Sequence, residues 1–98
     1  MESSAVSPAV TVLLPGALSE QTGGARTVEV MGGTVREVVQ ALDAVWPGMA
    51  FRLCAETGEL RTFVNVFVNG RNVRYLHGLE TPVPEGATLH ILPSVAGG

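Results

Sequence analysis

A single amphipathic helix, expected between two groups of strands, is the feature that most constrains how this 98-residue chain can fold. Thr34-Val35-Arg36-Glu37 has the form of a capping box, in which the threonine hydroxyl and the glutamate carboxylate each accept a hydrogen bond from a backbone N–H at the helix start. Pro47-Gly48 ends the helix. Between these signals, apolar residues recur with the spacing of one buried face: Val35, Val38, Val39, Leu42, Val45 and Trp46. Such a helix is expected to lie across one face of a sheet.

Strand signals precede this helix. Residues 9–14 are rich in β-branched and apolar side chains, and they end at Pro15-Gly16. Residues 26–31 alternate between apolar and polar side chains, which is typical of a half-buried strand. We expect the two segments to form a hairpin with a wide loop over residues 17–25.

Further strand signals follow the helix. Residues 62–68 carry the strongest strand pattern of the chain, and Asn69-Gly70 after them is the favoured dipeptide of a two-residue hairpin turn. Residues 73–75 are therefore expected to pair back, and residues 88–93 form the last strand. The region 49–61 is expected to be irregular, with Phe51 and Leu53 buried and a surface turn over residues 56–59.

The resulting order is β-β-α-β-β-β. All strands fit one mixed sheet if the first and last strands are central and parallel to each other, with connections of the usual handedness. We therefore predict an α+β, ubiquitin-like β-grasp fold, with one main helix packed across one face of the sheet. The predicted domain covers residues 1–93, and residues 94–98 are expected to form a flexible C-terminal tail.

Composition restricts the possible partners and compartment. The net charge is −3, and all six basic residues are arginine, which argues against electrostatic nucleic-acid binding. No apolar run approaches the roughly 18 residues of a membrane span. One cysteine and the lack of a signal-peptide pattern favour a reducing, cytoplasmic location.

The C-terminal segment ends in Gly97-Gly98. Pro93 removes a donor from the strand ladder, so the five residues after it are expected to form an extended arm of about 17 Å. Val95, Ala96 and Gly97 are expected to thread a narrow active site of a partner. Because glycine lacks a Cβ atom, the diglycine end allows the Gly98 carboxylate to approach the reacting group closely. A carboxylate is a poor acyl donor and has to be activated first. The chain is therefore expected to be a substrate of a partner enzyme rather than a catalyst.

Several segments resemble a known family. Leu92-Pro93-Ser94-Val95-Ala96-Gly97-Gly98 and Phe63-Val64-Asn65-Val66-Phe67-Val68-Asn69-Gly70, with Leu79 and Glu85-Gly86-Ala87 between them, resemble the ubiquitin-like sulfur carriers of the MoaD/ThiS superfamily. Within it, the chain looks most like the carriers of bacterial cysteine synthesis. The resemblance covers nearly the whole chain and is strongest over residues 61–98.

The resemblance implies a mechanism. An E1-like enzyme uses ATP to adenylate the carboxylate of Gly98, and a sulfur donor displaces AMP to leave a C-terminal thiocarboxylate. In the cysteine branch, a PLP-dependent cysteine synthase accepts the sulfur, and a metalloprotease regenerates the diglycine. PLP and zinc there belong to the partners, and the carrier itself binds no cofactor. Related carriers supply molybdopterin, thiamine thiazole or thio-containing secondary metabolites, and the shared motif does not choose between these pathways.

A docking patch is expected on the outer face of the sheet. Alternation along residues 62–68 places the valines toward the helix and Phe63 and Phe67 outward, and along the last strand it places Leu92 outward. Phe67, Leu92 and Phe63 are therefore candidates for partner docking. The alternative is that the segment 49–61 or the tail covers them.

Other reactive or charged residues have simpler interpretations. Cys54 is a possible persulfide acceptor, but a lone cysteine near apolar residues is more often a small buried hydrophobe. His77 and His90 lack neighbours at ligand spacing, so we predict no metal site. Arg71 and Arg74 flank the hairpin turn, where they either contact a partner or remain solvated.

Three functions remain open at this point. The first is a sulfur carrier, and the second is a ubiquitin-like modifier joined to target lysines through Gly98. The third is a β-grasp interaction domain in which the diglycine is incidental. Catalysis by the chain itself is disfavoured because it shows no nucleophile–base pair, paired carboxylates or phosphate-binding glycine loop.

Overall fold

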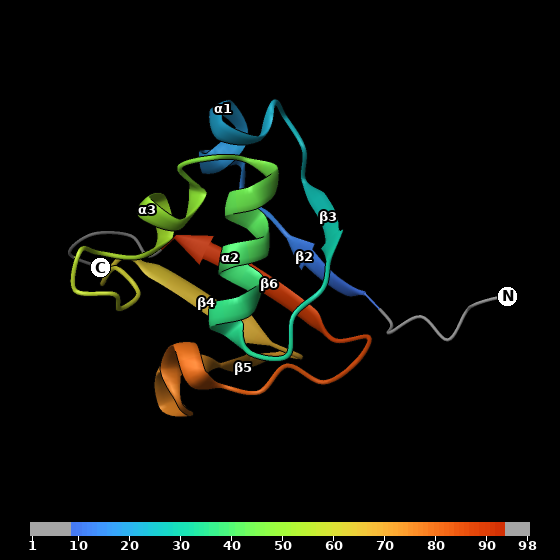
Figure 1. Ribbon diagram of the computed structural model, residues 1–98, viewed down its shortest axis with the longest axis vertical. Coiled ribbons are helices and arrows are strands. Elements are labelled where there is room, and N and C mark those ends of the chain that lie inside the picture. Colours follow the sequence, from blue (N-terminus) through green and yellow to red (C-terminus); the bar gives the residue numbers. More distant parts are fainter. Residues whose placement is uncertain (1–8, 94–98) are drawn as a thin grey trace, which may run out of the picture.

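The computed structural model describes residues 9–93 and contains one mixed sheet with the strand order β3-β2-β6-β4-β5 (Figure 1). Its strands are β2 (Val10–Leu13), β3 (Thr27–Val30), β4 (Val64–Val68), β5 (Arg71–Asn72) and β6 (Thr88–Pro93). Strands β2 and β6 are neighbours and run parallel, whereas the other pairs are antiparallel. The predicted β-grasp arrangement, with the first and last strands adjacent and parallel, is confirmed.

The main helix, α2 (Val35–Val45), begins as the capping pattern predicts. The Thr34 Oγ1 atom accepts a hydrogen bond from the Glu37 backbone N–H at 3.2 Å. The Glu37 carboxylate reaches one residue further back than in the standard box, because it accepts from the backbone N–H of Gly33 at 2.7 Å. Four of the six predicted apolar positions are buried and Trp46 is partly buried against the core, but Val45, in the last turn, is 49% exposed.

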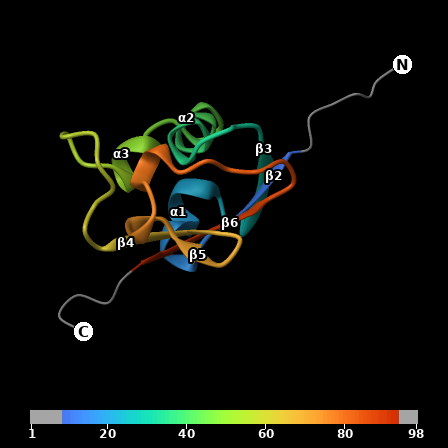
Figure 2. The same ribbon diagram turned by 90° about the horizontal axis from the view of Figure 1, so that it is seen from below.

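The core lies between the sheet and the helices α2 and α3 (Met49–Leu53), which cover the same face (Figure 2). Strand residues alternate as expected, so every second side chain of β2, β4 and β6 is buried: Val10, Val12, Val64, Val66, Val68, Leu89 and Ile91. Among residues 9–93, no helix is both long and apolar enough to cross a membrane.

Two connecting segments carry more helix than the sequence indicates. The wide loop after β2 contains a 3₁₀ turn, η1 (Gly16–Leu18), and a short helix, α1 (Ser19–Thr22). The region after α2, predicted to be irregular, begins with α3. Leu53 is buried there as predicted, but Phe51 is 61% exposed, so its predicted burial is wrong. On a helix of five residues, only one side can face the core, and Met49 and Leu53 occupy it.

The hairpin after β4 is shorter than predicted. Asn69 and Gly70 both have positive φ angles of 50° and 87°, as a two-residue hairpin turn requires, and β5 pairs back from Arg71. The predicted pairing of residues 73–75 is wrong, because they form the 3₁₀ turn η2 (Val73–Tyr75), which buries Val73 in the core. A second 3₁₀ turn, η3 (Gly78–Glu80), follows before β6.

Candidate functional site at the end of strand β6

Strand β6 carries the chain to the tail, and its two halves have different surroundings. Thr88, Leu89 and His90 pair with β2, and residues Leu89–Pro93 pair with β4. Strand β2 ends at Leu13, and the chain turns at Pro15 into η1. Among the described strands, only β4 therefore pairs with Ile91, Leu92 and Pro93. The predicted reactive and threading residues Gly98, Gly97, Ala96 and Val95 lie outside the described residues.

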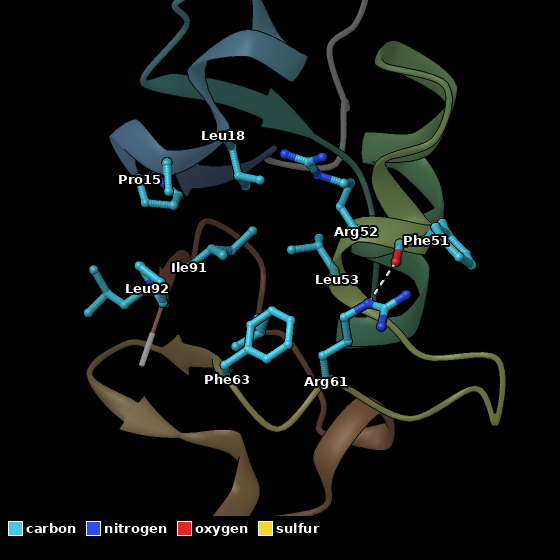
Figure 3. A pocket seen from close by; sticks show the side chains of 12 residues that line it. Pro15, Leu18, Phe51, Arg52, Leu53, Arg61, Phe63, Ile91 and Leu92 are labelled. Atoms are coloured by element: carbon cyan, nitrogen blue, oxygen red, sulfur yellow. Dashed lines mark hydrogen bonds between the residues drawn. The ribbon is translucent and has the colours of Figure 1, made fainter. Parts of the chain in front are cut away.

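A pocket of about 420 Å³ opens where β2 turns away from β6 (Figure 3). Its lining is mainly apolar and comes from four separate parts of the chain: Pro15, Ala17, Leu18, Phe51, Arg52, Leu53, Arg61, Phe63, Val64, Ile91, Leu92 and Pro93. Leu18, Leu53, Phe63 and Ile91 point toward the cavity from different sides. The pocket thus adjoins the point from which the tail leaves the sheet.

The wall formed by α3 is fixed by a carboxylate near the end of α2. The Asp43 Oδ1 atom accepts hydrogen bonds from the backbone N–H groups of Gly48 and Ala50, each at 3.0 Å. Gly48 has a φ angle of 97°, a conformation that side-chain-bearing residues rarely adopt. These contacts set the direction of α3 and hence the positions of Phe51, Arg52 and Leu53.

The opposite wall is held by arginines. The Arg61 Nε atom donates to the backbone oxygen of Phe51 at 2.9 Å, and its guanidinium lies 4.9 Å from the centre of the Phe51 ring. The Arg74 Nη2 atom donates to the backbone oxygens of Arg61 and Val64, each at 2.6 Å. Arg74 remains exposed, and its hydrogen bonds tie the turn before β4 to η2.

The rim of the pocket is positively charged. Arg52 and Arg61 both line it, and no aspartate or glutamate does so among the described residues. The guanidinium of Arg52 makes no hydrogen bond or ion pair within residues 9–93. In a chain with a net charge of −3, this is a local concentration of positive charge beside an apolar surface.

The three predicted docking residues line two hollows that share Leu92. Phe63 and Leu92 both line the pocket, and they are 52% and 36% exposed. Phe67 lies deeper in the sheet opposite His90 and is half-buried, and it lines a different hollow with Leu92. Phe63 is exposed and Val64 is buried, as alternation predicts, although β4 begins at Val64 and Phe63 belongs to the turn before it.

The family model for the ThiS family matches residues 12–98. The chain belongs to the ThiS family. Sulfur carrier protein CysO of Mycobacterium tuberculosis is 41% identical to this chain, over 91% of the chain and 98% of that protein. CysO in the crystal structure of the Amycolatopsis orientalis BexX/CysO complex is 45% identical, with a TM-score of 0.84 over 91% of this chain and 99% of that one. Small archaeal modifier protein 3 of Haloferax volcanii is 43% identical over 66% of this chain and 70% of that protein.

The remaining candidate residues of this ThiS-family chain show no reactive arrangement. Cys54 is half-buried, and desolvation by burial raises the pKa of its thiol, with Arg36 and Arg61 acting in the opposite direction. A raised pKa leaves less of the nucleophilic thiolate, so the structural interpretation of Cys54 is favoured. Within residues 9–93, no group of three or more His, Cys, Asp or Glu side chains is placed to hold a metal ion.

The sequence does not predict the pocket. Its walls come from segments near residues 15, 52, 62 and 92, and no local pattern indicates that these segments meet. One signal was available for its rim. Pro47-Gly48 directly before Met49 permits a second helix start after α2, and such a helix would have placed Phe51 away from Leu53.

Proposed function

We propose that this chain is a sulfur carrier protein that is charged at the C-terminal carboxylate of Gly98. The match to the ThiS family, which extends through residue 98, carries this proposal. The β-grasp fold and the relatives named as sulfur carriers support it. Carriers of this type are small substrates of their partner enzymes rather than catalysts, and they hold no cofactor of their own.

In the proposed reaction, an E1-like partner transfers AMP from ATP to the Gly98 carboxylate and releases pyrophosphate. A sulfur donor then displaces AMP, and the product is a thiocarboxylate at Gly98. Residues 1–93 act as the domain that docks, and residues 94–98 act as the tail, with Val95, Ala96 and Gly97 threading the partner's active site. We place this reaction in the cytoplasm.

The proposed acceptor is a PLP-dependent cysteine synthase, with a metalloprotease that restores the diglycine. This part of the proposal follows the two relatives named CysO. Incubating the charged carrier with such a synthase and O-phosphoserine is expected to yield cysteine. If no cysteine forms, the acceptor is the enzyme of another sulfur-requiring pathway.

A second candidate function is protein modification through Gly98. The identity to a small archaeal modifier protein favours it, but over a smaller part of the chain than the match to the sulfur carriers. The modifier is therefore the less favoured alternative.

Intact mass measurement after incubation with the cognate E1-like enzyme, ATP and a sulfide source separates the two candidates. An oxygen-for-sulfur exchange at the C-terminus is expected for the carrier. Isopeptide-linked adducts in cells, without that exchange, would instead favour the modifier. Neither product would leave an interaction domain whose diglycine has no chemical role.

A further inference from the structure

We propose that the pocket at the end of β6 is a docking site for the activating enzyme, and that it receives an apolar side chain of the enzyme with a carboxylate beside it. This inference rests on the proposed function, because it assigns a surface to the reaction that charges Gly98. The pocket lies between β6, η1 and α3, and it shares Leu92 with the predicted outer-face patch.

The pocket lies beside the last described residues of β6. Leu92 and Pro93 line the pocket and are the last described residues before the tail. Five extended residues span about 17 Å, so an enzyme whose active site encloses Gly98 has its surface within that distance of the pocket. The tail therefore brings the same enzyme surface to this pocket in every productive complex.

The size and the lining of the pocket suit an apolar side chain. A cavity of about 420 Å³ lies in the size range of sites that enclose a ligand group, and its walls are predominantly apolar. Phe63, which is 52% exposed, points into it from the turn before β4. Hydrogen bonds to the main chain hold the walls, because the Asp43 carboxylate accepts from backbone N–H groups and Arg61 and Arg74 donate to backbone oxygens. The pocket is therefore formed before a partner arrives. A preformed site loses less conformational entropy when a side chain enters it.

The positive charge of Arg52 and Arg61 at the rim favours a negatively charged group on the partner. The Arg52 guanidinium is unpaired within residues 9–93, and Arg61 offers its remaining N–H donors at the same rim. A carboxylate on the partner would accept charge-assisted hydrogen bonds from these arginines at two points. An acidic and apolar surface segment of the enzyme therefore complements the pocket.

The other possible occupants fit less well. The chain's own tail, Ser94-Val95-Ala96-Gly97-Gly98, has only one branched apolar side chain with which to fill the cavity. A second copy of the chain carries the same net charge of −3, which opposes association between copies. Both occupants remain outcomes of the experiment.

The experiment measures pyrophosphate release by the E1-like enzyme encoded in the same genome, with the concentration of the carrier varied. Phe63→Ser and Arg52→Glu are each expected to raise the KM for the carrier about tenfold, the effect of losing one anchor of an interface. The kcat is expected to stay unchanged, because the tail is intact in both variants. Matched controls are Tyr75→Ser and Arg71→Glu, an exposed aromatic residue and an exposed arginine that do not line the pocket. Both controls are expected to keep the wild-type KM.

Three results would overturn the inference. The first is a wild-type KM for both pocket variants, or an equal rise in the two controls. The second is a change in the backbone amide NMR signals of Leu53 and Phe63 in free, full-length Val95→Ser, which would place the tail in the pocket. The third is a dimer in sedimentation equilibrium that Phe63→Ser dissociates. A wild-type chain that releases no pyrophosphate would contradict the proposed function instead, and the docking inference with it.

Discussion

The two halves of strand β6 have different neighbours and different roles. Thr88, Leu89 and His90 are hydrogen-bonded to β2 on one side, and Leu89 and His90 also pair with β4 on the other. Ile91, Leu92 and Pro93 keep only β4 as a neighbour, and their free side borders the pocket. The first half holds the sheet together, whereas the second half presents a surface and the base of the tail.

With the proposed docking site in the second half, this difference would separate stability from recognition along one strand. Leu89 and Ile91 are buried beneath the helices in both halves, so the strand remains anchored along its length. The two halves differ at the edge of β6 that faces β2, because β2 ends three residues before β6 does. Variants on either side of that point are therefore expected to affect different measurements.

Deletion of Gly98 is expected to have the largest effect. It removes the carboxylate that the proposed partner activates, so charging should be abolished, while the unfolding temperature should not change because every core residue of the described part of the chain is kept. Gly97→Val is expected to block charging too, because a branched side chain beside Gly98 obstructs a narrow active site. Intact mass and thermal unfolding check both variants. Sulfur transfer to the chain that lacks Gly98 would refute the proposed function.

Leu89→Ala and Leu92→Ala compare the two halves in stability. Leu89 is 1% exposed, so its truncation should lower the free energy of unfolding by about 2–5 kcal/mol. Leu92 is 36% exposed, and its truncation should cost less than about 1 kcal/mol. Urea unfolding measures both values. Equal losses in the two variants would mean that the second half of β6 is as much a part of the core as the first.

Leu92→Ala and Phe67→Ala compare recognition beside the two halves, because Leu92 belongs to the second half and Phe67, on β4, pairs with His90 of the first half. Both are expected to slow adenylation without unfolding the domain, and the effect of Leu92→Ala should be the larger because Leu92 lines the pocket as well as the hollow that contains Phe67. Initial rates of pyrophosphate release, with circular dichroism as the control for folding, provide the test. Unchanged rates in both variants would exclude a docking role for the outer face.

Cys54, close to the pocket wall, is expected to give the smallest effect. Burial raises the pKa of its thiol, so the folded state keeps the proton to a higher pH than the unfolded state does. The associated stability is complete below the ordinary thiol pKa of about 8.5 and is lost as the pH rises through the folded-state value. Urea unfolding between neutral and alkaline pH should show this decline in the wild type, and Cys54→Ala should lack that part of it. An identical pH profile in the two proteins would mean that burial does not protect the thiol.

The features that the sequence predicts correctly depend on local chemistry. Thr34 and Glu37 mark the start of α2 because a capping box uses residues three positions apart, and Asn69-Gly70 marks the hairpin because that turn needs positive φ angles. The parallel contact of β2 with β6 also follows from the order of elements, since the β-grasp pairs the first and last strands.

The features that it misses depend on contacts between distant segments. Phe51 is exposed because Asp43 directs α3 and because Arg61 stacks on its ring. Neither contact is encoded by the apolar pattern of residues 49–53. The pocket has the same origin, since it exists only where the turn at Pro15, α3, the turn before β4 and the end of β6 come together.

The central place of β6 also has a consequence for how the protein is made. Strand β6 is the last of the described strands to be synthesised, and it joins the β2–β3 pair to the β4–β5 pair. Until it is synthesised, the two hairpins have no common sheet, and closing the contact between Val12 and Leu89 requires almost the whole chain. The domain therefore folds only after translation has reached residues 88–93. A nascent chain that stops earlier lacks the strand that joins the two hairpins, so it lacks the complete sheet.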